Sequence, residues 1–366
     1  MKISGDRLRL SASDVANFVA CQHLIRLDLL VARGKLSRPK DFDIGFEDLV
    51  KRGEAHERTV LDRFRADGRE VAEIGPAPDR DAAAATAGAI RDGADVIYQG
   101  VLLGENPDGG TALLGRPDFL VRADLLPAPD GEPRSGGVHY EVADAKLART
   151  AKARAVAQSA FYSHLLAGVQ GVRPRWMHLA LGNGELASLK VGHFAAYERQ
   201  TRRALGAFIA GDPGHNPPAD PYPEPVEHCA ICRWDDFCAD RRRRDDDLSL
   251  VAGITRDQRR ALKNAGVPTR RSLAARPALP DVRVSRESLE RAQLQARLQV
   301  ESEDRGRIQY EILDPERDSA GVPLPNRGLL ALPDPAPGDL FFDIEGARYY
   351  SEDNKEFGLQ YLFGIV

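Results

Sequence analysis

Two acidic residues and a lysine in the middle of the chain have side-chain types and spacings that could build a metal site. Asp144 and Lys146 alternate along the apolar stretch that begins at Tyr140, so in a strand they share one face. Asp118 comes late in the preceding apolar stretch and reaches the same place if the two strands are neighbours. Carboxylates hold a hard cation such as magnesium or manganese, and a lysine beside it can orient or deprotonate a water. Such a group is suited to hydrolysis of a phosphodiester bond.

Further polar residues flank this group and could complete it. His56 falls in a predicted helix, and one imidazole beside two carboxylates suits manganese as well as magnesium. Gln158 and Tyr162 share a face of the predicted helix that follows the Asp-x-Lys strand. Taken singly, His56 is most simply a surface or core histidine and Tyr162 a core residue, so only the ordered set favours a site. Glu57 and Glu141 are interpreted as neighbours rather than ligands, because strand alternation turns Glu141 to the other face.

The cysteines suggest a second metal centre. Cys229, Cys232 and Cys238 supply three thiolates within ten residues, and Cys21, in the predicted first helix, could supply a fourth. Both structural zinc and an iron–sulfur cluster fit that count, and His228 could substitute for a thiolate in a zinc site. Four thiols in a reducing compartment are not expected to form disulfides.

The apolar periodicity around these residues predicts alternating helices and strands, which is typical of an α/β fold. Helices are predicted from Ser11 onward and over residues 46–65, 81–92, 151–166 and 197–209. Strands are predicted over residues 95–103, 112–121, 140–149, 176–181 and 187–193.

Length and charge set the outer limits. A chain of 366 residues has room for about two or three domains. Its net charge of −4 gives no bulk argument for nucleic acid, so any such surface must be local. The N-terminus lacks an apolar signal core and no stretch is long enough to cross a bilayer, so we expect a cytoplasmic protein without a membrane partner.

The order of the polar residues resembles a known nuclease family. Pro117-Asp118 followed by Asp144-Ala145-Lys146 resembles the PD-(D/E)XK motif, and the segments around His56 and Gln158-x-x-x-Tyr162 resemble the flanking motifs of its RecB-like branch. The resemblance implies a restriction-endonuclease-like core, a central mixed sheet flanked by helices, over residues 1–245. It also implies roles for the residues concerned. The metal ligands would be His56, Asp118, Asp144 and the carbonyl of Ala145, Lys146 would be catalytic, and Gln158 and Tyr162 would position the substrate.

The cysteine arrangement is similar to the [4Fe–4S] centre of RecB-like iron–sulfur nucleases, which include AddB and the exonucleases of CRISPR adaptation. That resemblance implies a structural cluster held by Cys21, Cys229, Cys232 and Cys238, with zinc as the alternative. The run Arg241–Arg244 that follows is either a solvated face or a contact to phosphates.

The C-terminal third contains weaker patterns. Residues 246–280 resemble a helix–hairpin–helix segment, although Thr255 stands where a second hairpin glycine is usual, and a small helical linker is the alternative. Residues 281–335 are expected to form a linker, with helical periodicity only over 285–298. Residues 336–366 resemble the start of an RNase H-like, DEDD-type exonuclease domain, in which Asp343 and Glu345 would form a second acidic site. Only 21 residues follow Glu345, so that site is expected to be incomplete and inert.

These resemblances together imply a metal-dependent DNA nuclease in repair, recombination or defence, with exonuclease action on single strands or DNA ends favoured. The order of parts resembles the N-terminal part of large bacterial RecB-like nucleases, which often continue into a helicase. The resemblance implies that a helicase, in the same longer chain or separate, could be a partner. The sequence itself contains no nucleotide-binding P-loop motif, so no helicase motor is expected within it. The alternatives are a non-catalytic nucleic-acid-binding iron–sulfur module of a larger enzyme and an RNase that uses the same site.

Overall fold

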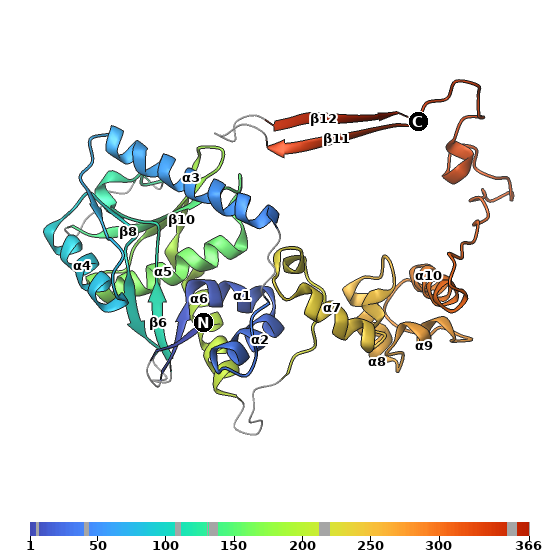
Figure 1. The fold of residues 1–366 in the computed structure, drawn as a ribbon, viewed down its shortest axis with the longest axis horizontal. Helices are drawn as coiled ribbons and strands as arrows, with labels where there is room; N and C mark the ends of the chain where they lie inside the picture. Colours follow the sequence, from blue (N-terminus) through green and yellow to red (C-terminus); the bar gives the residue numbers. More distant parts are fainter. Residues whose placement is uncertain are drawn as a thin grey trace. The chain divides into compact units, whose positions relative to one another are not determined.

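The chain divides into two compact units, one built mainly from Met1–Tyr222 and the other mainly from Pro223–Arg348. The structure is a computed structural model that describes residues 1–4, 7–39, 44–106, 111–129, 131, 138–211, 220–349 and 357–365. Figure 1 shows the helices and strands of both units, coloured along the sequence. Within the described ranges, none of the helices combines the length and the apolar character needed to cross a bilayer.

A six-stranded mixed sheet forms the centre of the first unit. Its strand order is β10-β9-β8-β7-β4-β3. The strands are β3 (Val71–Glu73), β4 (Val96–Tyr98), β7 (Phe119–Arg122), β8 (Tyr140–Lys146), β9 (Trp176–Leu181) and β10 (Leu186–Lys190). The central strand β8 runs antiparallel to β7 and parallel to β9. The predicted α/β class is therefore confirmed.

Helices cover both faces of this sheet (Figure 1). The helices of the unit are α1 (Ala12–Ala20), α2 (Gln22–Ala32), α3 (Ile44–Ala66), α4 (Asp79–Asp92), α5 (Ala153–Gln170) and α6 (Val191–Ala210). Phe119 and Ala143 turn to one face and pack with Val60 of α3, whereas Val142 turns to the other face and packs with Phe161 of α5. Strand alternation places Asp144 and Lys146 on the α5 face.

Two strands that the sequence predicts as continuous are each divided between two sheets. The predicted strand 95–103 is interrupted at Gln99, whose φ of 56° is left-handed, and the predicted strand 112–121 is interrupted at Pro117, which has no N–H for a ladder bond. One part of each belongs to the six-stranded sheet, and the other part belongs to a four-stranded sheet of order β1-β2-β6-β5. The strands of this second sheet are β1 (Lys2–Ser4), β2 (Arg7–Ser11), β5 (Leu102–Glu105) and β6 (Thr111–Gly115).

The predicted first helix begins where its capping residues indicate but ends early. Ser11 caps α1: its Oγ accepts a hydrogen bond from the Asp14 amide (3.3 Å), and Asp14 Oδ2 accepts one from the Ser11 amide (2.8 Å). The helix stops at Ala20, and Cys21, with an extended backbone, separates α1 from α2. The prediction that Cys21 lies inside a helix is therefore wrong, because the chain bends at that residue.

The second unit is largely helical and has its own apolar core. Its helical elements are η2 (Glu227–Ile231), α7 (Asp235–Arg244), η3 (Leu248–Leu250), α8 (Arg256–Asn264), α9 (Arg270–Ala274), α10 (Arg286–Arg305) and η4 (Gly328–Ala331). Thr255 caps α8, accepting a hydrogen bond from the Gln258 amide (3.3 Å), which gives this departure from the hairpin pattern a structural role. Leu262 of α8 and Leu289 and Ala296 of α10 belong to one buried cluster. The structured part thus extends into residues 281–335, where the sequence predicts a linker.

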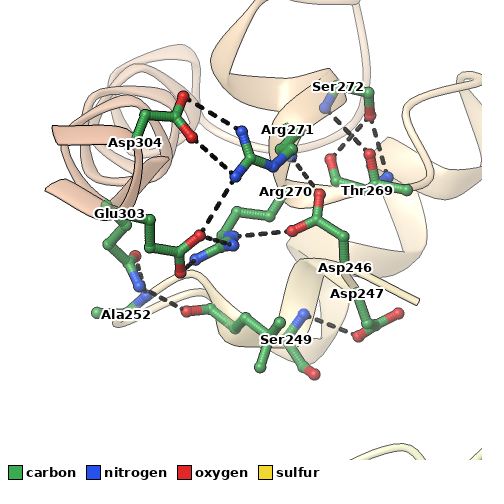
Figure 2. Close-up of polar contacts among 12 residues, drawn as sticks. Asp246, Asp247, Ser249, Ala252, Thr269, Arg270, Arg271, Ser272, Glu303 and Asp304 are labelled. Atoms are coloured by element: carbon green, nitrogen blue, oxygen red, sulfur yellow. Dashed lines mark hydrogen bonds and ion pairs between the residues drawn. The ribbon is translucent and has the colours of Figure 1, made fainter. Parts of the chain in front are cut away.

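Two arginines at the start of α9 join this helix to its neighbours (Figure 2). Arg270, with a side chain 8% exposed, pairs with Asp246 (Nε–Oδ1 3.0 Å) and with Glu303 of α10 (Nη2–Oε2 2.7 Å). Arg271, which is 50% exposed, pairs with Asp304 (Nη2–Oδ1 3.0 Å). The buried arginine therefore connects the segment before η3, α9 and the end of α10.

The last described strands, β11 (Phe342–Tyr349) and β12 (Phe357–Ile365), pair with each other. Asp343 and Glu345 are exposed on β11 and, two residues apart, share a face of that strand.

Candidate active site

The ends of β7 and β8 bring Asp118 and Asp144 together. The two strands are antiparallel with Phe119 opposite Ala143, which sets Asp118 across from Asp144. The Asp118 amide donates to Asp144 Oδ1 (3.3 Å), and the Ala145 amide donates to Asp118 Oδ2 (2.8 Å). Main-chain donors of each strand thus hold the carboxylate of the other. The two acids converge because their strands are neighbours, which is the condition stated from the sequence.

Lys146 supplies the positive charge of this group. Its Nζ forms an ion pair with Asp144 Oδ2 and lies 4.0 Å from Asp118 Oδ2. The Asp144 side chain is 1% exposed and that of Lys146 is 26% exposed. In the described part of the chain, Asp144 Oδ2 has no well-aligned hydrogen bond besides this ion pair. The geometry leaves a buried carboxylate oxygen with unused acceptor capacity.

The three charged groups shift one another's protonation. Burial and then repulsion from Asp144 raise the pKa of Asp118 well above its ordinary value of 3.8, and Lys146 only partly offsets this. Burial lowers the pKa of Lys146, but the two carboxylates outweigh burial and the pKa ends above its ordinary value. Lys146 is therefore an ammonium at neutral pH. One more cation next to the two carboxylates would reduce the repulsion between them.

The helix α5 presents its two predicted residues to the same group. Gln158 Nε2 donates to the Tyr162 hydroxyl (3.1 Å), and Tyr162 is 5% exposed. Burial, followed by the charges of Asp144 and Asp118, raises the pKa of Tyr162. Its hydroxyl therefore stays protonated and lies within electrostatic range of the acids.

His56 is not brought to the two carboxylates. Its Nε2 lies 2.9 Å from the carbonyl oxygen of Ala180, and α3 packs on the sheet face opposite to that of Asp144. Among the described residues, no three His, Cys, Asp or Glu side chains converge closely enough to hold a metal ion. The structure thus brings Asp118, Asp144 and Lys146 together. The His56 ring is hydrogen-bonded to the Ala180 carbonyl instead.

From the sequence, Glu57, the residue after His56, is interpreted only as a neighbour of the site, but its charge acts on residues of the site. Its charge contributes to the raised pKa of Asp118 and, with burial as the larger cause, to a pKa of about 12 for Tyr98. Gln99 donates a side-chain hydrogen bond to Glu57, and its amide donates to the Asp118 carbonyl (2.8 Å). Because Glu57 is an acidic residue next to His56, the sequence offered a signal that could have found it, whereas nothing in the sequence marks Gln99.

Glu141, expected to point away from the acids, belongs to a separate buried network. Its carboxylate accepts hydrogen bonds from the Trp176 amide (3.0 Å) and from His178 Nε2 (3.0 Å). His178 Nδ1 lies 2.8 Å from Ser188 Oγ. This network joins β8, β9 and β10 and explains why a charged residue is tolerated in the sheet interior.

The cysteines lie on short local elements. Cys229 and Cys232 close one turn, with the Cys232 amide donating to the Cys229 carbonyl (3.0 Å), and Cys238 is buried on α7. The Val226 amide donates to Cys229 Sγ at 3.4 Å, and hydrogen bonds to sulfur of this kind tune iron–sulfur centres. Cys21 belongs to the other unit. Within the described residues these thiols do not converge closely enough to hold a metal ion, so the structure shows the residue types of a thiolate centre but not an assembled one.

The chain matches no protein-family model and no curated protein sequence. Fold and site define an α/β protein whose central sheet carries two carboxylates and a lysine at the ends of adjacent strands.

Proposed function

We propose that this protein is a metal-dependent DNA nuclease of the PD-(D/E)XK type, in its RecB-like branch, acting as an exonuclease on single strands or DNA ends. The observation that supports this most directly is the convergence of Asp118, Asp144 and Lys146 at the ends of β7 and β8. Paired carboxylates with an adjacent ammonium suit attack on a phosphodiester, because the reaction needs a held cation and stabilisation of growing negative charge.

The two carboxylates fit a divalent cation. Asp144 Oδ2 is buried with unused acceptor capacity, and repulsion between the acids raises the pKa of Asp118, so a bound cation would be favoured there. Asp118, Asp144 and the carbonyl of Ala145 would hold magnesium or manganese. When bound, the metal supplies a water of lowered pKa and offsets phosphate charge. His56 would join these ligands only if its ring leaves the Ala180 carbonyl.

The other residues of the site orient and stabilise. Because Lys146 is an ammonium at neutral pH, its role is to orient the attacking water and to stabilise charge on the phosphate, rather than to accept a proton. Gln158 and Tyr162, which are hydrogen-bonded to each other on α5, position the DNA strand next to the two acids.

A [4Fe–4S] cluster bound by Cys21, Cys229, Cys232 and Cys238 is part of this proposal, as a structural centre, with zinc as the alternative. The three local thiols and the N–H···S bond at Cys229 support a thiolate centre without choosing between the two metals. A helicase, in the same longer chain or separate, is the proposed partner. The segment with Asp343 and Glu345 would begin an RNase H-like domain.

Two other functions predict different behaviour. A non-catalytic binding module would bind nucleic acid without cutting it, and an RNase would use the same acids on RNA. The test is digestion of labelled linear and circular DNA, single- and double-stranded, and of RNA, with manganese or magnesium. Wild type is compared with Lys146→Ala and Asp144→Ala, and with Glu185→Gln, which alters an exposed acid on the turn between β9 and β10.

The proposal predicts cutting of linear DNA by wild type and by Glu185→Gln, loss of cutting in both site variants, and resistance of circular single strands. Equal cutting by all four proteins would show that the activity lies elsewhere. Binding of DNA without cutting would favour the module, and cutting restricted to RNA would favour the RNase.

A further inference from the structure

A cavity of about 350 Å³ opens beside the ammonium of Lys146. It is lined by the connection from β8 to α5, the first turns of α5 and the end of β9, all in the first unit. Its volume lies in the range of pockets that hold small ligands. Since Lys146 also contacts Asp118 and Asp144, whatever occupies this cavity lies next to the acid pair.

The cavity has a cationic rim and an apolar floor. Lys152 and Arg154 are exposed at the rim, whereas Leu179 and Leu181 are 0% and 2% exposed. With Lys146 the lining carries three positive side chains, and none of its ten described residues is acidic. Arg154 Nη2 donates to Asn17 Oδ1 of α1 at 3.0 Å, which fixes the guanidinium in place. Such a surface favours a ligand that is anionic at one end and apolar at the other.

The lining also indicates which part of a nucleotide is recognised. Among the described residues that line the cavity none is aromatic, so bases cannot stack there as they do in single-strand binding grooves. Lysine and arginine bind phosphate, and the polar tip of Gln158 adds one hydrogen-bonding group. Recognition is therefore directed at the phosphate and sugar and is independent of sequence.

We infer that this cavity is the subsite for the nucleotide next to the cleaved bond, held through its phosphate by Lys152 and Arg154. The inference rests on the proposed nuclease function. The phosphate has two sources, an internal position of the strand or a phosphorylated strand end. Both present the same chemistry to the rim.

The test measures binding by the full chain, separately from cutting. A fluorescein-labelled single-stranded oligonucleotide is titrated with protein by anisotropy, with calcium in place of manganese, at several salt concentrations. The variant is Lys152→Ala/Arg154→Ala. Two controls accompany it: Asn17→Ala removes the partner of Arg154 but keeps its charge, and Arg33→Ala/Arg203→Ala removes two exposed cations outside the cavity.

We expect the double variant to bind about tenfold more weakly, because two charged donors to phosphate are removed. The slope of log affinity against log salt should fall by about 0.7 for each phosphate that the variant no longer neutralises. Oligonucleotides with 5′-phosphate, 3′-phosphate or hydroxyl ends distinguish the source. Equal weakening on all of them assigns an internal phosphate, and weakening on one phosphorylated end assigns that end.

The inference is overturned if the double variant behaves like the Arg33→Ala/Arg203→Ala control. Asn17→Ala, which keeps the charge of Arg154, should leave the salt dependence of wild type unchanged, and a salt slope reduced as in the double variant would also contradict the inference. It is separable from the proposed function. Wild-type protein that cuts while the rim variant binds and cuts normally would refute the subsite alone. Wild-type protein that never cuts, but binds through the rim, would refute the nuclease alone.

Discussion

Replacing Lys146 by methionine should destabilise the metal-free protein, because it leaves the buried Asp144 without its counter-charge. The second partner, Asp118, sets the scale of the interaction. Lys146 Nζ lies 4.0 Å from Asp118 Oδ2, and two unit charges at that distance interact by about 4 kcal/mol at an effective dielectric constant of 20. The desolvation of Lys146 offsets part of that gain, but breaking a buried pair on one side still costs about 3 kcal/mol. We therefore expect the free energy of unfolding to fall by about 3 kcal/mol at pH 8 in the presence of a chelator.

The pH dependence has a definite sign. Burial and Asp144 raise the pKa of Asp118 above its ordinary value of 3.8, so the folded state holds this proton more tightly than the unfolded state. The contribution of Asp118 to stability is therefore greatest below about pH 4 and falls as pH rises through the raised pKa. Without the Lys146 charge the pKa of Asp118 rises further, so in the variant the decrease in stability with rising pH continues to higher pH. Acidification or added manganese should each restore part of the lost stability.

Native-state hydrogen exchange of peptides from β8 and β9 measures this locally, so unfolding of the second unit does not interfere. Lys152→Met, which removes an exposed lysine near the same strand, is the control and should change the opening free energy by less than about 0.5 kcal/mol. Equal protection in Lys146→Met and wild type across the whole pH range would refute the reasoning. It would mean that the ammonium contributes nothing to holding the acids.

Three further changes test other parts of the structure. Arg270→Met should reduce the stability of the helical unit by about 2–3 kcal/mol in hydrogen exchange of α10, because two acidic partners lose a largely buried guanidinium. Arg271→Met, which alters a half-exposed side chain, should leave that exchange nearly unchanged. Gly182→Ala should cost about 2 kcal/mol in exchange of β9 and reduce cutting, since its Cβ would stand 2.2 Å from the Leu147 carbonyl oxygen, next to Lys146; full activity and stability would contradict this. Anaerobically purified protein should be brown, with absorbance that Cys229→Ser diminishes; colourless protein with stoichiometric zinc would assign the alternative metal.

The acid pair could be predicted from the sequence because only strand geometry is needed to build it. Alternation fixes Asp144 and Lys146 on one face of β8, and pairing with the preceding strand then sets Asp118 opposite. The helices predicted over 46–65 and 151–166 are found as α3 and α5, although α5 continues four residues beyond its predicted end. These features depend on local pattern and on one nearest-neighbour pairing.

Features that depend on packing could not be predicted in the same way. The helix α10 shows in the sequence only as weak periodicity within a linker, because its buried face includes Ala292 and Ala296, which carry little hydrophobic signal. The division of the predicted strand 95–103 depends on the left-handed Gln99, a residue type with no special preference for that conformation. Its hydrogen bonds to the Asp118 carbonyl and to Glu57 explain why that conformation is held.

The choice between His56 and Glu57 shows where sequence reasoning ends. Adjacent residues on a helix point about 100° apart, so at most one of them faces a given group. Which one does so is decided by the rotation of α3, and that rotation is set by Val60 and Leu61 packing against the sheet. In this arrangement the imidazole meets the Ala180 carbonyl, and the carboxylate of Glu57 adds to the negative charge around Asp118. The sequence motif therefore specifies the two strand acids more firmly than it specifies the helix residue that accompanies them.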